Sequence, residues 1–483
     1  MRIIGNAGTA PRKVQAVASG ALPNGKSVVV NSNGTVSAVS GTSISQSKGS
    51  EVSFNAGQSM GLSSAFDINS GKVVVTYKDG ANSDYPTAVV GTISGSSVSF
   101  GSEVVIDTVS SGTCTVYDEN ANKVAVFYVR NGLKGKVGTV SGTGISFGSA
   151  GLIDLPSDPT LTKRGAIFDP DTNKIVVAYK QASSSSKAVI ATISGTDITF
   201  GTPAVLESST AGREEIGLGY DTLNNKVIVA HRNPNSPYDC KVVVGTVSSN
   251  SISFGSEATF NAGNQSYPAT PVFDPSSGKV VIAYRDGSNS SYGKTVLGTV
   301  SGTSITFGSP VTWHSGTTYN ATSAYHADAK KVVTFFTNGS SSARGDVVVG
   351  SVSGSSITYT SGFALSPNNT NTQTLLTYDS TNKIILANYV SEDDYHGEAV
   401  VYQPAYTSTN LTAENYIGIS KGGASDGGTA RVQIGSAING AQSSLTAGQQ
   451  YFVQTDGTIG LTADDPSVLA GTAVSATDII VKG

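Results

Sequence analysis

A repeat of about 52 residues limits the fold of this chain more than any other feature. An aromatic residue followed by Asp recurs just before an apolar run, and Asp is replaced by His once. Successive Asp or His positions lie 51 to 53 residues apart, which gives seven copies. The pairs are Phe66-Asp67, Tyr117-Asp118, Phe168-Asp169, Tyr220-Asp221, Phe273-Asp274, Tyr325-His326 and Tyr378-Asp379. An aromatic-Gly step gives the same count, with degenerate versions at Lys48-Gly49 and Tyr359-Thr360.

Each repeat predicts four short strands. In one copy the first strand ends in ATPVFD (269–274), and the second is KVVIAYRD (279–286). The third is KTVLGTVSG (294–302), and the fourth is TSITFGSPVTW (303–313). The second strand is almost continuously apolar, as expected for a strand covered on both faces. The third and fourth alternate, and turn-forming residues separate all four.

Four antiparallel strands at a period near 50 are typical of a propeller blade. A β-helix has much shorter coils, and an immunoglobulin-type sandwich needs about 100 residues per domain. We therefore predict an all-β chain with a seven-bladed β-propeller of four-stranded blades at 43–405. The last repeat stops before its fourth strand, and a fourth strand without a repeat lies near 43–54. We expect this strand to complete the last blade, which removes two open sheet edges.

The two ends of the chain resemble each other. LPNGKSVVVNSNGTVSAV (22–39) matches LTAGQQYFVQTDGTIGLT (445–462), with Gly25 and Gly34 in the places of Gly448 and Gly457. Asn-Gly and Asp-Gly between apolar runs predict two-residue hairpin turns. We therefore expect small terminal β modules: an N-terminal hairpin attachment segment at 1–42 and a small β domain at 406–483.

The composition argues against several classes of protein. Charged residues make up 13% of the chain and the net charge is −4, so no nucleic-acid partner is expected. No run of 18 apolar residues is present, so we expect no transmembrane segment. The start, MRIIGNAGTAPRKVQ, lacks an apolar segment, so we expect no secretory signal peptide and a cytosolic location or release by lysis. Cys114 and Cys240 are expected to be free, buried thiols.

No motif predicts catalysis, a metal or a cofactor. His231 stands where other repeats have Tyr, and His326 stands in the Asp position, so both are interpreted as repeat positions. The repeated Asp is expected to cap its own turn. The run Asp169-Pro-Asp171-Thr-Asn173 opens like a calcium loop but lacks the required Gly and Glu. We therefore predict a protein without an enzymatic activity.

The loops on one face of the predicted propeller vary far more than those on the other. These are the loops from second to third strands and from one repeat to the next. Variable loops on a repeating frame are typical of a recognition surface, and Tyr with Asn, Asp and Ser suits sugars. Four arginines, 164, 213, 232 and 285, fall near loops; separate solvated arginines are the favoured interpretation and a carboxylate-binding cluster the alternative. The candidate ligand-binding residues are Tyr85, Tyr238, Tyr267, Tyr292, Tyr319, Tyr395, Arg232, Arg285, Asp84 and Asp239.

The C-terminal stretch YFVQTDGTIGLTADDPSVLAGTAVSATDIIVKG resembles the terminal module of virion structural proteins from marine tailed phages, cyanophages in particular. The VVGTISG and ISFGSEV repeats are similar to repeats in such proteins. The resemblance implies a virion appendage, such as a tail fibre or spike, on the tail or capsid surface. It carries over no catalytic residue.

We therefore expect the propeller to bind a host-surface receptor such as a glycan, while the terminal modules dock to other virion structural proteins. A homo-oligomer is left open. One alternative is a purely structural tail, connector or capsid-decoration protein without a host ligand. A second is a propeller enzyme that degrades glycans.

Overall fold

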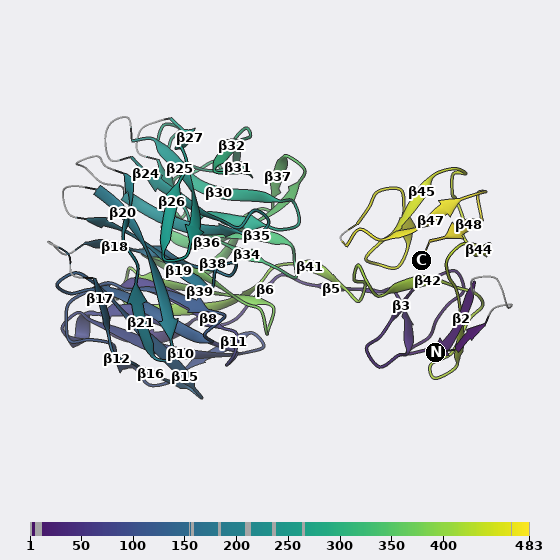
Figure 1. Ribbon diagram of the computed structural model, residues 1–483, viewed down its shortest axis with the longest axis horizontal. Helices are drawn as coiled ribbons and strands as arrows, with labels where there is room; N and C mark the ends of the chain where they lie inside the picture. Colours follow the sequence, from purple (N-terminus) through teal and green to yellow (C-terminus); the bar gives the residue numbers. More distant parts are fainter. Residues whose placement is uncertain are drawn as a thin grey trace. The chain divides into compact units, whose positions relative to one another are not determined.

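The chain folds almost entirely into β-strands. The computed structural model describes residues 2–4, 12–153, 155, 159–181, 185–207, 214–233, 238–262, 266–464 and 466–482. These residues contain one short 3₁₀ helix, η1 (Gly80–Asn82), and no α-helix. The chain divides into two compact units, one of residues 46–404 and one of residues 1–45 together with 405–483 (Figure 1).

The larger unit contains the repeats, and each repeat forms antiparallel strands paired in sequence order. The first strands are β8 (Ser59–Asp67), β13 (Cys114–Asp118), β18 (Thr160–Asp169), β23 (Glu214–Asp221), β28 (Tyr267–Pro268) with β29 (Val272–Asp274), β34 (Thr318–His326) and the later part of β38 (Phe363–Asp379). The second strands are β9 (Lys72–Asp79), β14 (Lys123–Val129), β19 (Lys174–Gln181), β24 (Lys226–Arg232), β30 (Lys279–Asp286), β35 (Lys331–Asn338) and β39 (Ile384–Ser391). The third strands are β10 (Tyr85–Ser94), β15 (Leu133–Ser141), β20 (Ser185–Ser194), β25 (Cys240–Ser248), β31 (Tyr292–Ser301), β36 (Arg344–Ser353) and β40 (Gly397–Gln403).

The fourth strand of a repeat is broken into two segments, although the sequence predicts one. Both segments pair with the same third strand, as β11 and β12 do with β10. The segments are β11 (Ser97–Phe100) and β12 (Val104–Val105), β16 (Gly144–Phe147) and β17 (Gly151–Ile153), β21 (Asp197–Phe200) and β22 (Ala204–Glu207), β26 (Ser251–Phe254) and β27 (Ala258–Asn261), and β32 (Ser304–Phe307) and β33 (Val311–His314). In the next repeat β37 (Ser356–Tyr359) is followed by the start of β38, which continues into the last repeat and joins both into one sheet.

The break falls at the aromatic-Gly step, and in most repeats the next repeat packs closely against that glycine. A Cβ at Gly101 would lie 1.9 Å from the carbonyl oxygen of Thr143, and one at Gly201 would lie 2.1 Å from that of Asn250. Only a residue without a side chain allows this approach of two backbones. The step seen in the sequence is therefore a packing contact between neighbouring repeats.

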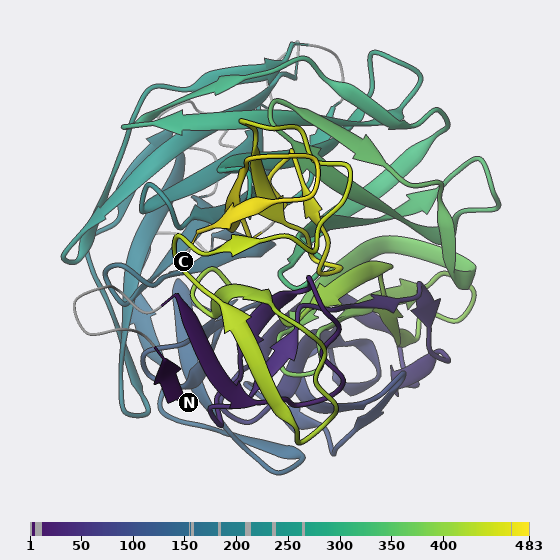
Figure 2. The same cartoon turned by 90° about the vertical axis from the view of Figure 1, so that its right-hand side faces the viewer.

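The repeats follow one another around a ring. Their first strands lie side by side in the order β8, β13, β18, β23, β29, β34 and β38, and β38 lies beside β8. Figure 2 shows the sequence colours running around this ring from purple through teal to green. This arrangement of small sheets fits a β-propeller.

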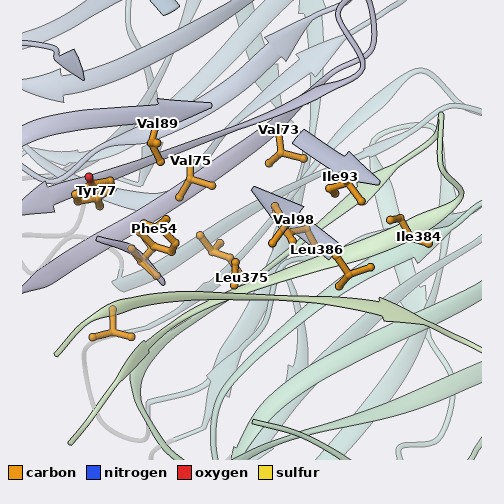
Figure 3. Close-up of a cluster of buried hydrophobic side chains, with 14 residues drawn as sticks. Phe54, Val73, Val75, Tyr77, Val89, Ile93, Val98, Leu375, Ile384 and Leu386 are labelled. Atoms are coloured by element: carbon orange, nitrogen blue, oxygen red, sulfur yellow. The ribbon is translucent and has the colours of Figure 1, made fainter. Parts of the chain in front are cut away.

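The expected closing strand is present. The segments β6 (Ser47–Lys48) and β7 (Val52–Asn55) pair with β40, the third strand of the last repeat. The predicted strand near 43–54 is corrected at its start, because Gly41–Ile44 forms β5 in the other unit and pairs with β41 (Tyr406–Thr409). A hydrophobic cluster between the first and last repeats includes Phe54, Val75 and Leu386 (Figure 3).

The residue in the Asp position closes its own turn, as the sequence predicts. The Asp67 Oδ1 atom accepts hydrogen bonds from the backbone N–H groups of Asn69 and Ser70, at 3.0 and 3.1 Å. His326 closes its turn in the same way with a ring nitrogen, since its Nδ1 accepts a hydrogen bond from the Ala329 N–H at 3.1 Å. Burial lowers the pKa of His326, which agrees with a neutral imidazole that accepts at Nδ1.

The smaller unit interleaves the two ends of the chain. One sheet has the order β1 (Arg2–Ile4), β2 (Lys13–Val17), β43 (Thr429–Gln433), β42 (Tyr416–Ser420), β3 (Ser27–Val30) and β4 (Val36–Ala38). The other has the order β44 (Ile438–Asn439), β48 (Ile479–Val481), β47 (Leu469–Ala473), β45 (Gln450–Val453) and β46 (Ile459–Gly460). The segments expected as separate modules at 1–42 and 406–483 thus share one sheet.

The two matching hairpins have the same turn, which differs from the predicted two-residue turn. The Gly34 N–H donates to the Asn31 carbonyl, and the Gly457 N–H donates to the Gln454 carbonyl, both at 2.9 Å. Only the glycine has a positive φ, 79° at Gly34 and 84° at Gly457, so each loop has three residues and ends in a left-handed glycine.

Candidate functional site

Five of the predicted binding residues form a continuous ladder of alternating rings and guanidinium groups. The Arg232 guanidinium lies over the rings of Tyr238 and Tyr267, at 5.6 and 4.4 Å from their centroids. The Arg285 guanidinium lies over the rings of Tyr267 and Tyr319, at 5.1 and 5.0 Å. Each such contact is worth about 0.5–2 kcal/mol, depending on how well water is excluded. The favoured interpretation of separate solvated arginines is therefore wrong for Arg232 and Arg285.

The ladder follows from the repeat and from strand register. Arg232 and Arg285 occupy equivalent positions near the ends of second strands, and Tyr267 and Tyr319 occupy equivalent positions where first strands begin. Within one repeat, Tyr267 pairs directly with Arg285 across β28 and β30. Between repeats, β24 lies beside β28, and β30 lies beside β34. Side chains at two fixed positions thus meet repeatedly along the ring.

The ladder borders a cavity of about 730 Å³. Tyr267, Arg285 and Tyr319 line it, together with residues outside the list of candidate ligand-binding residues. A volume of this size falls in the range of small-molecule sites. The other lining residues are Gly61, Arg164, Glu215, Pro268, Asn320, Ala321, Thr337, Ala343, Thr370, Gln373 and Glu392.

Five lining residues occupy one position of the repeat, six residues before the Asp or His that closes the turn. They are Gly61, Glu215, Pro268, Asn320 and Gln373. Register shifts interrupt the pairing of first and second strands here, for instance between Met60 and Ser63 and between Tyr319 and Thr322. A bulge re-aims the side chain at its centre. Five first strands therefore each contribute a different residue type to the cavity from the same position of the repeat.

Arg164 is the most unusual polar side chain of the cavity. Its Nε is buried and has no hydrogen-bond partner among the described residues, and one terminal nitrogen donates a long 3.4 Å bond to the Thr374 carbonyl. Burial lowers the pKa of Arg164 to about 10, and the nearby Glu215 carboxylate opposes this shift. A buried donor without a partner costs about 1–3 kcal/mol, which is a cost that a bound acceptor would remove.

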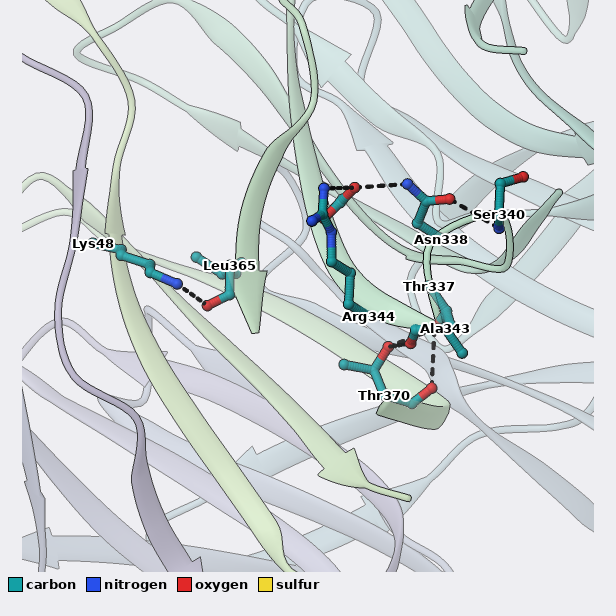
Figure 4. Close-up of polar contacts among 9 residues, drawn as sticks. Lys48, Thr337, Asn338, Ser340, Ala343, Arg344, Leu365 and Thr370 are labelled. Carbon is teal, nitrogen blue, oxygen red and sulfur yellow. Dashed lines mark hydrogen bonds and ion pairs between the residues drawn. The ribbon is translucent and has the colours of Figure 1, made fainter. Parts of the chain in front are cut away.

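One wall of the cavity is rigidly bonded (Figure 4). The Thr370 N–H and hydroxyl donate to the Ala343 carbonyl at 2.9 and 3.2 Å. The Thr337 and Thr370 hydroxyls lie 2.8 Å apart. Next to this wall, the Arg344 guanidinium forms an ion pair with the Asp346 carboxylate at 2.8 Å. Its charge is therefore already matched within the protein.

The remaining predicted residues lie outside the ladder. Asp84 forms an ion pair with Lys78 at 3.0 Å, and Tyr395 is exposed in a loop. Tyr85 and Tyr292 begin third strands and are partly buried. No ring or cation–π contact of the described residues includes these three tyrosines. Asp239 has a buried Oδ1 without a hydrogen-bond partner in the part of the chain that the structure describes.

Other chemistry considered from the sequence takes structural roles. The Asp169 carboxylate accepts from the N–H groups of Asp171 and Thr172, as in the other turns. His231 is buried, and its Nε2 lies 3.2 Å from Glu257, much as the Tyr77 hydroxyl bonds to Glu103. Cys114 and Cys240 are free and buried, as predicted.

The described residues offer neither a metal-binding cluster nor a membrane-spanning helix. No group of three or more His, Cys, Asp or Glu side chains is arranged to hold a metal ion. Within the same residues, no helix has the length and apolar character needed to cross a membrane. Arg213 lies outside the described residues.

The cavity residues that the sequence analysis did not name are Glu215, Asn320, Gln373 and Glu392, whereas Arg164 belongs to the arginine cluster held as an alternative. A partial signal exists for three of them, because Glu215, Asn320 and Gln373 share the position six residues before the turn Asp or His, and this position differs in chemistry between repeats. A regular alternating strand pattern does not reveal the bulge that falls at this position.

Comparison with known proteins yields no family assignment. No protein-family model and no curated protein matches the chain. Among solved structures, a protein from Lactobacillus plantarum has 10% identity and a TM-score of 0.46, covering 61% of this chain and 82% of its own. The C-terminal WD40 domain of Sif2 has 11% identity and a TM-score of 0.46, covering 74% of this chain and 99% of its own. These values are too low to carry an inference about function.

Proposed function

We propose that this chain is a receptor-binding component of a phage virion appendage. Its repeats form a seven-bladed propeller with four strand positions per blade, and the variable-loop face of the propeller binds a host-surface glycan. Two observations support the proposed fold: the ring of first strands, and the pairing of β6 and β7 with β40. It draws the virion context from the resemblance of the C-terminal stretch to phage virion proteins.

One observation supports binding above all others. A 730 Å³ cavity bordered by the Arg–Tyr ladder lies where variable loops and the starts of first strands converge. The smaller unit, which carries both chain ends, would dock to other virion proteins.

An adsorption competition tests the proposal. The full-length chain is added to host cells before infection with the phage that encodes it, and free phage is counted over time. We expect the chain to slow adsorption, and we expect Tyr319→Ala to weaken this effect at least severalfold. Undiminished adsorption at saturating protein would remove the receptor-binding role and favour a purely structural virion part.

Glu215 and Glu392 give the enzyme alternative its support, since both carboxylates line the cavity. Glycan hydrolysis requires a pair of carboxyl groups at the cleavage point. The assay is release of reducing ends from host polysaccharide by the full chain. We expect no release; release abolished by Glu392→Gln would establish the enzyme instead.

A further inference from the structure

Two aromatic rings lie beside the Arg285 guanidinium, and no hydrogen bond of the described residues engages its donors. The rings of Tyr267 and Tyr319 lie 5.1 and 5.0 Å from it. Its Nε is buried without a hydrogen-bond partner, and it takes part in no ion pair among the described residues. The N–H donors of a guanidinium lie in its plane and match the two oxygens of a carboxylate. Two stacked rings would hold that plane in a fixed orientation.

The cavity beside Arg285 supplies a second cationic group and neutral polar groups. Arg164 also has a buried Nε without a partner. The Gln373 Oε1 accepts from the Leu62 N–H at 2.8 Å, which leaves its amide N–H groups as donors. Asn320 lines the same space. Guanidinium and amide donors near exposed tyrosine edges suit a sugar that carries an acidic group.

The acidic residues of the cavity do not cancel its preference for a ligand with an acidic group. The Glu215 carboxylate interacts electrostatically with Arg164, so its negative charge is balanced by that arginine. Glu392 is exposed in the loop after β39, where solvent screens its charge. Arg285 therefore remains the cavity's cation without a matched carboxylate.

We propose that the cavity binds the carboxylate of a uronic-acid residue in an acidic polysaccharide, with Arg285 as the bidentate anchor and Arg164 as a second donor. The inference deepens the proposed receptor function and rests on it. It departs from the simplest picture of tyrosines stacking on neutral sugars, because Tyr267 stacks on two arginines instead. Recognition then depends on charge and on planar geometry, with sugar hydroxyls bonded by Asn320 and Gln373.

The test compares three polymers that differ in charge and geometry. Polygalacturonate oligomers carry carboxylates, their methyl esters keep the backbone without the charge, and dextran sulfate supplies anions of tetrahedral geometry. Binding to the full-length chain is measured by calorimetry at fixed ionic strength. We expect the methyl ester to bind at least tenfold more weakly than the acid, and dextran sulfate to compete poorly at matched charge.

Two variants locate the binding. Arg285→Lys keeps the charge and removes the bidentate fork, and we expect affinity for polygalacturonate to fall at least tenfold. Arg130→Lys is the matched control, because Arg130 lies in another variable loop, is paired with Asp107 at 2.8 Å and does not line the cavity. We expect this control to bind normally, and thermal unfolding verifies that both variants fold.

The outcomes separate this inference from the proposed function. Equal affinity for the acid and the methyl ester, no binding of polygalacturonate, or normal binding by Arg285→Lys would each overturn the carboxylate site. If the chain still slowed phage adsorption in those cases, the receptor role would stand without it. If polygalacturonate bound through Arg285 while adsorption was unaffected, the site would stand and the receptor role would fall.

Discussion

Gly201 and Gly308 occupy the same place in two repeats but differ in their surroundings. A Cβ at Gly201 would lie 2.1 Å from the Asn250 carbonyl oxygen, whereas the nearest atoms to one at Gly308 lie 3.9 Å away. Neither glycine has a positive φ, so only the contact differs. We predict that Gly201→Ala lowers the free energy of unfolding by about 1–3 kcal/mol, as overpacking does. Gly308→Ala should change it little; equal thermal midpoints for the two variants would contradict the packing account.

Glu398 gives a second prediction at this scale, for the dependence of stability on pH. Burial, followed by the Glu51 and Asp394 carboxylates, raises the pKa of Glu398 to about 7, and Ser53 opposes the shift. The unfolded chain should titrate near the ordinary value of 4.5. The contribution of Glu398 to stability is therefore fully present below about pH 4.5 and is lost as the pH rises through about 7.

We expect Glu398→Gln to be more stable than the natural chain at pH 8, by on the order of 2–3 kcal/mol. At pH 4, below the ordinary pKa, the difference should nearly vanish. Denaturant unfolding at both pH values measures it, and Glu119→Gln, which changes an exposed carboxylate, is the control. A constant difference between the two pH values would show that the Glu398 carboxyl does not titrate as described.

At the scale of strands, β7 and β27 offer a natural comparison. Phe54 in β7 packs on Tyr77 and Phe100 at centroid distances of 5.4 and 5.6 Å. Phe260 in β27 packs on Tyr284 and Phe307 at the same two distances. The chain reaches β27 directly from its own sheet, whereas β7 joins a sheet made by residues more than 300 positions later. Side-chain packing therefore has to hold the closing strand in place.

We predict that Phe54→Ala and Phe260→Ala each lower the free energy of unfolding by about 3–5 kcal/mol. Phe54→Ala should also accelerate amide hydrogen exchange across 47–55 far more than Phe260→Ala does across 251–261. Similar local exchange in the two variants would mean that β6 and β7 do not depend on Phe54 to close the ring.

The sequence predicts the regular strands well because period-2 and apolar patterns report burial directly. The second strand predicted at 279–286 coincides with β30. The sequence pattern fails where the geometry depends on a neighbouring repeat. The fourth strand, predicted as one, is split at a step whose glycine in most repeats lies against the backbone of the next repeat. The bulges at the starts of the first strands were not predicted either, and the cavity residues Glu215 and Asn320 lie there. The ladder could have been predicted, since Arg232 and Arg285 occupy one position of the repeat, and Tyr267 and Tyr319 occupy another.

At the scale of the whole molecule, we assign attachment to one unit and recognition to the other. The ends of the chain, expected as separate modules, share a sheet through the pairing of β2 with β43 and of β3 with β42. A unit that gathers both ends leaves the other unit to present its loops. The proposal therefore predicts attachment through residues 1–45 and 405–483, and recognition through the ladder and its cavity.

The central claim is that the ladder face meets the host. Cryo-electron microscopy of the particle that contains this chain tests it most directly. The account predicts that the surface bearing Tyr238, Tyr267 and Tyr319 points to solvent, away from the particle, while the unit with both chain ends contacts other virion proteins. If the ladder is instead buried against another virion subunit, the variable loops serve assembly, and the receptor-binding account is contradicted.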